Sequence, residues 1–153
     1  MSPIFATLDI DTASRLRQLI GRLSRRLRPT AAAVAAGLTP TKISVLLHVA
    51  RAGRMRLSEL SESEGINPTM LSRVIADLSE SGLLERVCDP GDRRAAFVEP
   101  TPAGRRLAER IRRERTDALD LALEGLDEHE RSQIEAALPA LERLAEQLKE
   151  GRP

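Results

Sequence analysis

The residues whose types and spacing suggest chemistry lie on one face of a short predicted helix that begins at Pro68. At about 100° of rotation per residue, Thr69, Ser72 and Arg73 fall on the same side of this helix. The opposite side is apolar and carries Met70, Leu71, Val74, Ile75 and Leu78. A buried back and a front of small, hydrogen-bonding side chains suit a helix that enters the DNA major groove and contacts base edges. An ordinary amphipathic surface helix has the same pattern, so this helix alone leaves both interpretations open.

A second candidate group is a charged turn at residues 89–94, with the sequence Asp-Pro-Gly-Asp-Arg-Arg. Its first four residues are strong turn formers, and short strand candidates at 83–88 and 95–99 flank it. The pattern predicts a β-hairpin whose tip carries Arg93 and Arg94, which suits a probe of the DNA minor groove. A solvated turn is the alternative, but a hairpin that directly follows a helix pair favours binding to nucleic acid.

Two short helices joined by a tight turn would position the candidate helix. The first has Ser58 as its expected N-cap and ends at Gly65. Asn67 is expected to cap the second helix, Pro68 to open it and Gly82 to end it. This spacing is typical of a helix-turn-helix.

Longer helices are predicted before this unit. A leucine stripe marks residues 11–27, and Thr39 with Pro40 begins a largely apolar helix that ends at Gly53. The alanine-rich residues 30–37 between these helices are interpreted as a connector.

Two helices are predicted after the hairpin. Thr101 and Pro102 open a long one, and Asp127 with Glu130 forms the capping-box start of the last. Pro139 lies inside the last helical pattern and is expected to kink or break it. The predicted fold class is therefore mainly α with a small β-hairpin wing, a winged helix-turn-helix flanked by N- and C-terminal helices.

Length and composition narrow the classes of function. The 153 residues are expected to form a single domain, and aromatic residues make up only 1% of them, which argues against recognition by base stacking. The single Cys88 excludes an internal disulfide framework and a multi-cysteine zinc site. No catalytic constellation, metal site or cofactor-binding loop is recognisable, so neither enzyme activity nor a cofactor is predicted. Without a signal-peptide pattern or a membrane-spanning run, a cytoplasmic protein with no membrane contact is expected.

The net charge of +1 conceals an uneven distribution along the chain. It is +8 over residues 1–56, −5 over residues 57–100 and −2 over residues 101–153. The candidate helix carries one basic residue, Arg73, against two acidic ones. Because non-specific affinity for DNA grows with the number of phosphates neutralised, this part of the chain predicts a weak electrostatic contribution.

Two motifs together identify a family resemblance. The first runs from Leu57-Ser58-Glu59-Leu60 through Ile66-Asn67-Pro68-Thr69-Met70-Leu71-Ser72-Arg73 to Gly82-Leu83-Leu84-Glu85-Arg86. The second is Asp92-Arg93-Arg94 followed by Thr101-Pro102-Ala103-Gly104. Both resemble the multiple antibiotic resistance regulator (MarR) family of winged helix-turn-helix transcriptional regulators. The sharp motifs cover about residues 57–104, while the length and the order of the helices match over nearly the whole chain.

The resemblance implies a homodimer whose terminal helices interlock. Within the single domain 1–153, residues 1–37 and 105–153 would be dimerisation helices, and residues 39–104 would form the DNA-binding lobe. Each lobe would place its recognition helix in a major groove of a pseudo-palindromic operator on double-stranded DNA. The leucine stripes of the terminal helices are consistent with such a dimer, because a small winged lobe alone does not cover them.

The resemblance also implies individual DNA contacts. The residues concerned are Asn67, Pro68, Thr69, Ser72, Arg73, Asp92, Arg93 and Arg94. Arg94 is expected in the minor groove, oriented by Asp92 through a charge-assisted hydrogen bond, while Arg93 contacts phosphate. Asn67 and Pro68 set the entrance of the helix. Thr69, Ser72 and Arg73 face DNA bases or the DNA backbone.

Members of this family usually respond to a small anionic aromatic molecule or to oxidation of a cysteine. The implied function is a bacterial repressor released by a small anionic or lipophilic effector, whose pocket the sequence does not identify. Arg15, Arg17 and His48 are candidates for holding an anion. Two alternatives stay open: a winged-helix protein-interaction module without DNA binding, and a thiol-based redox regulator acting through Cys88.

Overall fold

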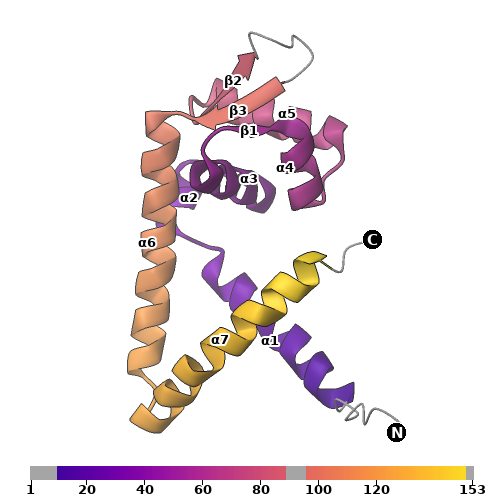
Figure 1. Cartoon of the computed structure of the whole chain (residues 1–153). Helices are drawn as coiled ribbons and strands as arrows, with labels where there is room; N and C mark the ends of the chain where they lie inside the picture. The colour runs from indigo at the N-terminus through magenta and orange to yellow at the C-terminus, as the bar shows by residue number, and fades with distance from the viewer. Residues whose placement is uncertain (1–9, 89–95, 151–153) are drawn as a thin grey trace, which may run out of the picture. The chain divides into compact units, whose positions relative to one another are not determined.

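The computed structural model describes residues 10–88 and 96–150 (Figure 1). Over these ranges it contains seven α-helices and three β-strands, in the order α1 (Ile10–Leu27), α2 (Ala31–Ala35), α3 (Pro40–Ala52), β1 (Met55–Arg56), α4 (Leu57–Glu64), α5 (Pro68–Glu80), β2 (Leu84–Cys88), β3 (Ala96–Pro100), α6 (Pro102–Glu124) and α7 (Glu128–Glu150). The chain divides into two compact units, residues 1–115 and residues 116–153. The predicted fold class, mainly α with a small hairpin, is confirmed.

Helix α3 forms the centre of the first unit. It begins at Pro40 because the Thr39 side chain accepts a hydrogen bond from the backbone N–H of Lys42 at 3.4 Å. Its buried residues pack against apolar side chains of α4, α5, β2 and β3, and the cluster comprises Val45, Leu46, Val49, Leu60, Leu71, Val74, Ile75, Leu78, Leu83, Leu84, Val98 and Ala108. This core fixes the helix pair α4–α5 against the sheet.

The three strands form an antiparallel sheet in the order β1–β3–β2. Arg86 of β2 lies opposite Val98 of β3, and the two strands of the predicted hairpin are confirmed. β1 consists of Met55 and Arg56 alone, which pair with Val98 and Phe97. Two residues are too few to show an alternating pattern, so nothing in the sequence marked this strand.

The alanine-rich segment is a helix, and its interpretation as a connector is wrong. Thr30 caps α2 by accepting a hydrogen bond from the backbone N–H of Ala33 at 3.2 Å. Both carboxylate oxygens of Glu114, on α6, accept from the backbone N–H of Ala32, at 3.2 and 3.0 Å. A partner so distant in the sequence stabilises a short helix that local signals do not reveal.

The start of α4 also differs from the prediction. The helix begins at Leu57, one residue before the expected cap at Ser58. The N-cap position is Arg56, whose backbone N–H donates to Glu59 Oε2 at 3.2 Å. The Glu59 carboxylate therefore supplies the stabilisation at this helix end that Ser58 was expected to supply.

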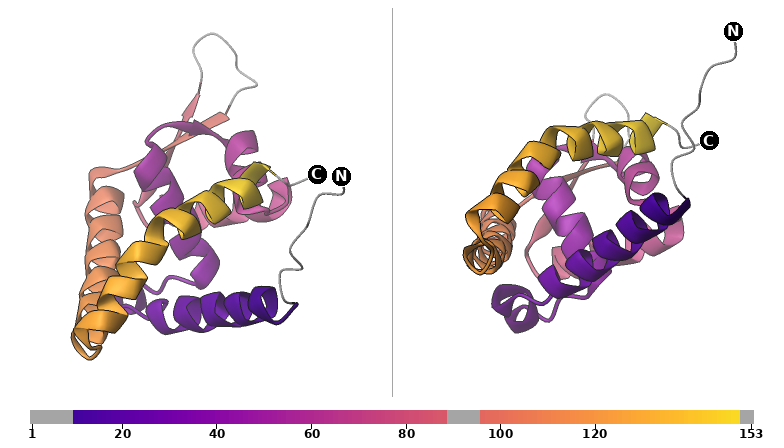
Figure 2. Two further views of the ribbon diagram at one scale, coloured as in Figure 1. Left: turned by 60° about the horizontal axis from the view of Figure 1, so that its bottom comes forward. Right: turned by 90° about the horizontal axis from the view of Figure 1, so that it is seen from below.

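In the second unit, α7 runs as one continuous helix, so of the predicted kink or break at Pro139 the break does not occur (Figure 2). The residues around it are exposed, so water can satisfy the carbonyl that loses its partner to the proline. The predicted capping box is confirmed, because Asp127 Oδ1 accepts from the N–H of Glu130 at 2.8 Å and Glu130 Oε2 accepts from that of Asp127 at 3.1 Å. Among the described helices, none combines the length and the apolar character that a membrane span needs.

Candidate nucleic-acid interface

Helix α5 presents the face that the sequence predicts. Asn67 Oδ1 accepts a hydrogen bond from the backbone N–H of Met70 at 2.8 Å, and Pro68 is the first helical residue. The side chains on its back are buried, namely Leu71, Val74, Ile75 and Leu78. Thr69, Ser72 and Arg73 are exposed on the other side. Met70 departs from the prediction, because it is 46% exposed.

Two cationic side chains tie α5 to its neighbours. Lys42 Nζ, from α3, lies 2.8 Å from Asp77 Oδ2 of α5. Arg86 of β2 donates from Nη2 to the backbone carbonyl of Ser72 at 3.3 Å. Lys42 therefore compensates one of the two acidic charges of α5, and Arg86 adds a second cation beside Arg73 to the surface near Ser72. The charge count of α5 alone misses both effects, because each partner lies on another element.

The base of the hairpin is fixed by Thr101 and Gly104. Thr101 Oγ1 donates to the carbonyl of Gly82 at 2.6 Å and accepts from the N–H of Gly104 at 3.0 Å. The N–H of Thr101 donates to the carbonyl of Leu83 at 3.1 Å. A Cβ on Gly104 would lie 1.9 Å from that same carbonyl oxygen. The Thr-x-x-Gly pattern thus lets the start of α6 pack directly on the turn between α5 and β2.

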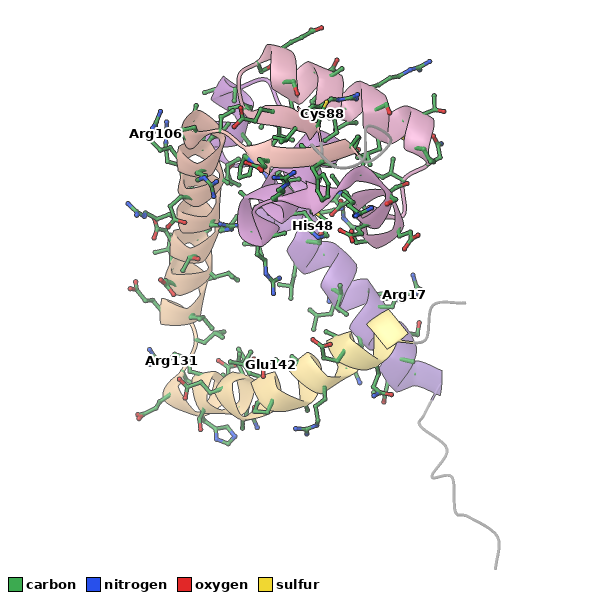
Figure 3. The ribbon with its side chains drawn as sticks, turned by 45° about the horizontal axis from the view of Figure 1, so that its top comes forward. Arg17, His48, Cys88, Arg106, Arg131 and Glu142 are labelled. Carbon is green, nitrogen blue, oxygen red and sulfur yellow. The ribbon has the colours of Figure 1, made fainter. Side chains whose placement is uncertain are left out.

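The tip of the hairpin lies outside the described residues. Asp92, Arg93 and Arg94 belong to it, so their predicted contacts stay predictions. Cys88, the last residue of β2, is described and exposed (Figure 3).

Two arginines on the far side of the sheet pack on an aromatic ring. The guanidinium carbons of Arg54 and Arg56 lie 4.4 and 5.1 Å from the ring centroid of Phe97. Arg54 Nε also lies 3.6 Å from Glu99 Oε1. Phe97 alternates along β3 with the buried Val98, so this cluster and α5 lie on opposite faces of the sheet.

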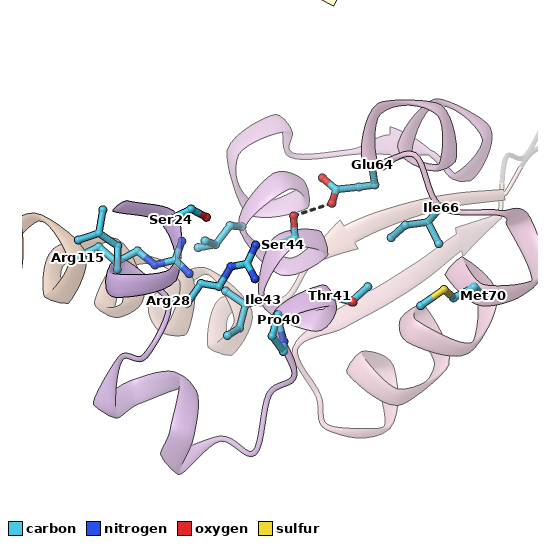
Figure 4. Close-up of a pocket in the computed structure, with 12 residues that line it drawn as sticks. Ser24, Arg28, Pro40, Thr41, Ile43, Ser44, Glu64, Ile66, Met70 and Arg115 are labelled. Atoms are coloured by element: carbon cyan, nitrogen blue, oxygen red, sulfur yellow. Dashed lines mark hydrogen bonds between the residues drawn. The ribbon is translucent and has the colours of Figure 1, made fainter. Parts of the chain in front are cut away.

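A cavity of about 640 Å³ opens beside α3 within the first unit (Figure 4). Its lining residues come from α1 and the residue after it, from α3, α4, α5 and α6, and from the α4–α5 turn. They are Ser24, Leu27, Arg28, Pro40, Thr41, Ile43, Ser44, Leu47, Glu64, Ile66, Met70 and Arg115. The cavity therefore contacts both helices of the helix-turn-helix, including α5 through Met70.

The arginines that line this cavity are not those expected from the sequence. Arg15 pairs loosely with Asp11 at 3.8 Å, and neither it nor Arg17 is among the lining residues. His48 does not line the cavity either, although its Nδ1 lies 2.6 Å from Oε1 of the lining residue Glu64. Arg28, just after α1, and Arg115 of α6 are far apart in the sequence, so no local pattern identifies them.

Comparison with known proteins gives consistent results. The model of the MarR family matches residues 38–96. The HTH-type transcriptional regulator Mb0904 of Mycobacterium bovis is 32% identical over 129 residues, covering 84% of this chain and 89% of the relative. A transcriptional regulator from Pseudomonas aeruginosa has a similar structure, with a TM-score of 0.76 and 31% identity over 92% of this chain and 98% of that one. NadR, solved with 4-hydroxyphenylacetate, shares the fold with a TM-score of 0.63 and 23% identity over 92% and 96% of the two chains.

Proposed function

The chain belongs to the MarR family of DNA-binding transcriptional regulators. From this membership we propose that it acts as a homodimeric repressor of a pseudo-palindromic operator and is released by a small-molecule effector. The observation that carries the proposal is α5, with its apolar back buried in the core and a polar front of Thr69, Ser72 and Arg73 exposed. Its relatives are named as regulators, and no catalytic role is proposed for any residue. In this role the protein acts in the cytoplasm, where bacterial DNA lies.

In this proposal α5 is the recognition helix. Thr69, Ser72 and Arg73 hydrogen-bond to base edges or backbone in the major groove. Asn67 and Pro68 set the entrance of the helix, whose first backbone N–H groups face a phosphate. The lobe that binds DNA comprises residues 39–104, as the burial of α5 against α3 and the sheet supports.

The hairpin supplies the minor-groove contact. We assign insertion into the groove to Arg94, orientation of its side chain to Asp92 and a phosphate contact to Arg93, on the strength of the sequence motif. Replacing Arg94→Ala is expected to weaken operator binding by more than about tenfold and to leave the dimer intact, because the lost contact contributes a few kcal/mol. Fluorescence anisotropy on the operator duplex measures the affinity. Arg131→Ala, which removes the same charge from exposed α7, serves as the control, and unchanged binding by the Arg94 variant would refute this assignment.

Arg86 is proposed as a phosphate contact beside the recognition helix. Its guanidinium lies next to the Ser72 carbonyl and adds a second cation close to Arg73. Arg86→Gln is therefore expected to weaken binding to any duplex a few-fold and to reduce the slope of log affinity against log salt by about one. A salt titration by anisotropy gives this slope, with Arg105→Gln on exposed α6 as the matched charge control. A slope equal to that of the wild type would contradict this role.

The proposed dimer rests on apolar side chains that the described chain leaves uncovered. On α1 they are Leu19, Ile20 and Leu23, between 43% and 52% exposed. On α7 they recur along one face as Ile134, Leu138, Leu141, Leu144 and Leu148. Apolar stripes of this length indicate a protein interface. We propose that helices within residues 1–37 and 105–153 pair with those of a second copy.

The cavity is the proposed place of the effector. NadR was solved with the small aromatic acid 4-hydroxyphenylacetate, which supports a small-molecule effector for a protein of this fold. Here the cavity touches α5 through Met70 and α4 through Glu64, so a bound molecule would act directly on the helices that contact DNA.

A further inference from the structure

We propose that the effector cavity takes a small dipolar molecule, whose anionic group binds Arg28 and Arg115 and whose hydrogen-bond donor, such as an ammonium group, binds Glu64. This inference rests on the proposed function, because it names the chemical class of the effector. It is carried by the charges at the two ends of the cavity and by the apolar residues that also line it.

The cationic end consists of two arginines without a carboxylate. Among the described residues, neither Arg28 nor Arg115 forms an ion pair, and Nε of Arg115 is buried with no hydrogen-bond partner. Burial lowers the pKa of Arg115, and the nearby charge of Arg28 lowers this pKa further. An anion would stabilise these two neighbouring positive charges and could accept a hydrogen bond from the unsatisfied Nε of Arg115. Guanidinium groups bind carboxylate or phosphate through two parallel hydrogen bonds.

The acidic end is Glu64, whose side chain is only 11% exposed. Its Oε2 accepts a hydrogen bond from Ser44 Oγ at 2.6 Å, and its Oε1 lies 2.6 Å from His48 Nδ1. An ionised carboxylate accepts about four hydrogen bonds, so Glu64 retains capacity for a donor from a ligand. It is the only acidic residue among the described residues that line the cavity.

Figure 4 shows how the two ends are arranged. Arg28, which follows α1, and Arg115 of α6 lie on one side, whereas Glu64 stands on the other side, towards Ile66 and Met70. The rest of the lining is mixed, with Ser24, Thr41 and Ser44 polar and six residues apolar: Leu27, Pro40, Ile43, Leu47, Ile66 and Met70. The complementary molecule therefore has an anion and a donor separated by an apolar body.

Simpler molecules fit this lining less well. A monoanion without a donor satisfies the arginines but places its other end against the Glu64 carboxylate. A cation gives Glu64 a further donor but meets the two guanidinium groups, and a neutral apolar molecule adds a partner at neither end. Only the dipolar molecule offers an anion to Arg28 and to the unsatisfied Nε of Arg115 while adding a donor at Glu64.

Calorimetric titration of the full-length protein with three matched probes tests the proposal. The probes are 4-(aminomethyl)benzoate, which carries both charges, 4-methylbenzoate, which carries only the anion, and 4-methylbenzylamine, which carries only the cation. We expect the dipolar probe to bind at least about tenfold more tightly than either singly charged probe, because it makes one further charge-assisted contact. Equal or weaker binding of the dipolar probe, or no binding of it at millimolar concentration, would overturn the proposal.

Two variants assign the ends of the cavity. Glu64→Gln, which can still accept from Ser44, should weaken binding of the dipolar probe about tenfold and leave the affinity for 4-methylbenzoate equal or higher. Arg28→Gln, at an exposed position, should weaken binding of both acids. If Glu64→Gln weakens the binding of both acidic probes equally, Glu64 has a structural role only and the proposal fails. The Arg28 variant remains interpretable even if the Glu64 variant does not fold. Fluorescence anisotropy of the wild-type protein on DNA distinguishes the failure of this proposal from the failure of the proposed function. If the protein binds DNA but does not prefer the dipolar probe, only the proposed class of effector is refuted.

Discussion

Replacing Gly104→Ala is expected to lower the free energy of unfolding by about 3 kcal/mol. The new methyl group would lie 1.9 Å from the backbone oxygen of Leu83, a distance that no side-chain rotation can relieve. Either the start of α6 must move away from the turn, or the hydrogen bonds of Thr101 to Gly82 and Leu83 must break. Urea denaturation followed by circular dichroism measures the loss.

Gly125→Ala is the control for this prediction. Gly125 follows α6, and a Cβ there meets nothing closer than the Ala122 carbonyl oxygen at 3.4 Å, an ordinary contact. The free energy of unfolding of the Gly125→Ala variant should stay within about 1 kcal/mol of that of the wild type. If the Gly104 variant were as stable as this control, the close packing of α6 on the α5–β2 turn would be refuted.

The second large effect is expected at the proposed dimer interface. Leu141→Glu places a charge in the middle of the apolar face of α7, where Leu141 is 43% exposed in the single chain. Burying that charge against a second copy costs several kcal/mol, so the variant should be monomeric. Loss of the second half-site contact should then weaken operator binding by on the order of a hundredfold. Light scattering after size exclusion gives the mass, and anisotropy gives the affinity.

Arg143→Glu is the matched control, because it introduces the same side chain at an exposed position on the other side of α7. This variant should remain a dimer and bind the operator at nearly the wild-type level. A dimeric Leu141 variant, or a monomeric wild-type protein, would contradict the proposed use of α7.

Most of the fold follows from local signals in the sequence. Thr39, Asn67 and Thr101 each precede a proline and each cap the helix that follows, because the side-chain oxygen reaches a free backbone N–H three residues on. The apolar back of α5 follows from helical periodicity in the same way. These contacts span three or four residues, so a single sequence contains everything needed to predict them.

The features that the sequence does not reveal depend on contacts between distant segments. The helix α2 requires the Glu114 carboxylate, and the charge of Asp77 is compensated by Lys42 of another helix. The cavity shows the same limit, because Arg28 and Arg115 both line it although they lie far apart in the sequence. Glu64 shows it too, because its hydrogen-bond partners, Ser44 and His48, lie on α3 rather than on its own helix. Local patterns thus predict the recognition helix well and the effector site poorly.

Sequence-selective DNA binding tests the central claim most directly. Fluorescence anisotropy of the wild-type protein would compare a duplex from the upstream region of its own gene with a scrambled duplex, at two salt concentrations. Tight binding to the upstream duplex, with weaker binding to the scrambled one and a steep loss of affinity as salt rises, is the predicted result. A folded dimer that binds both duplexes equally weakly and without salt dependence would contradict the account and favour a protein partner for the winged lobe.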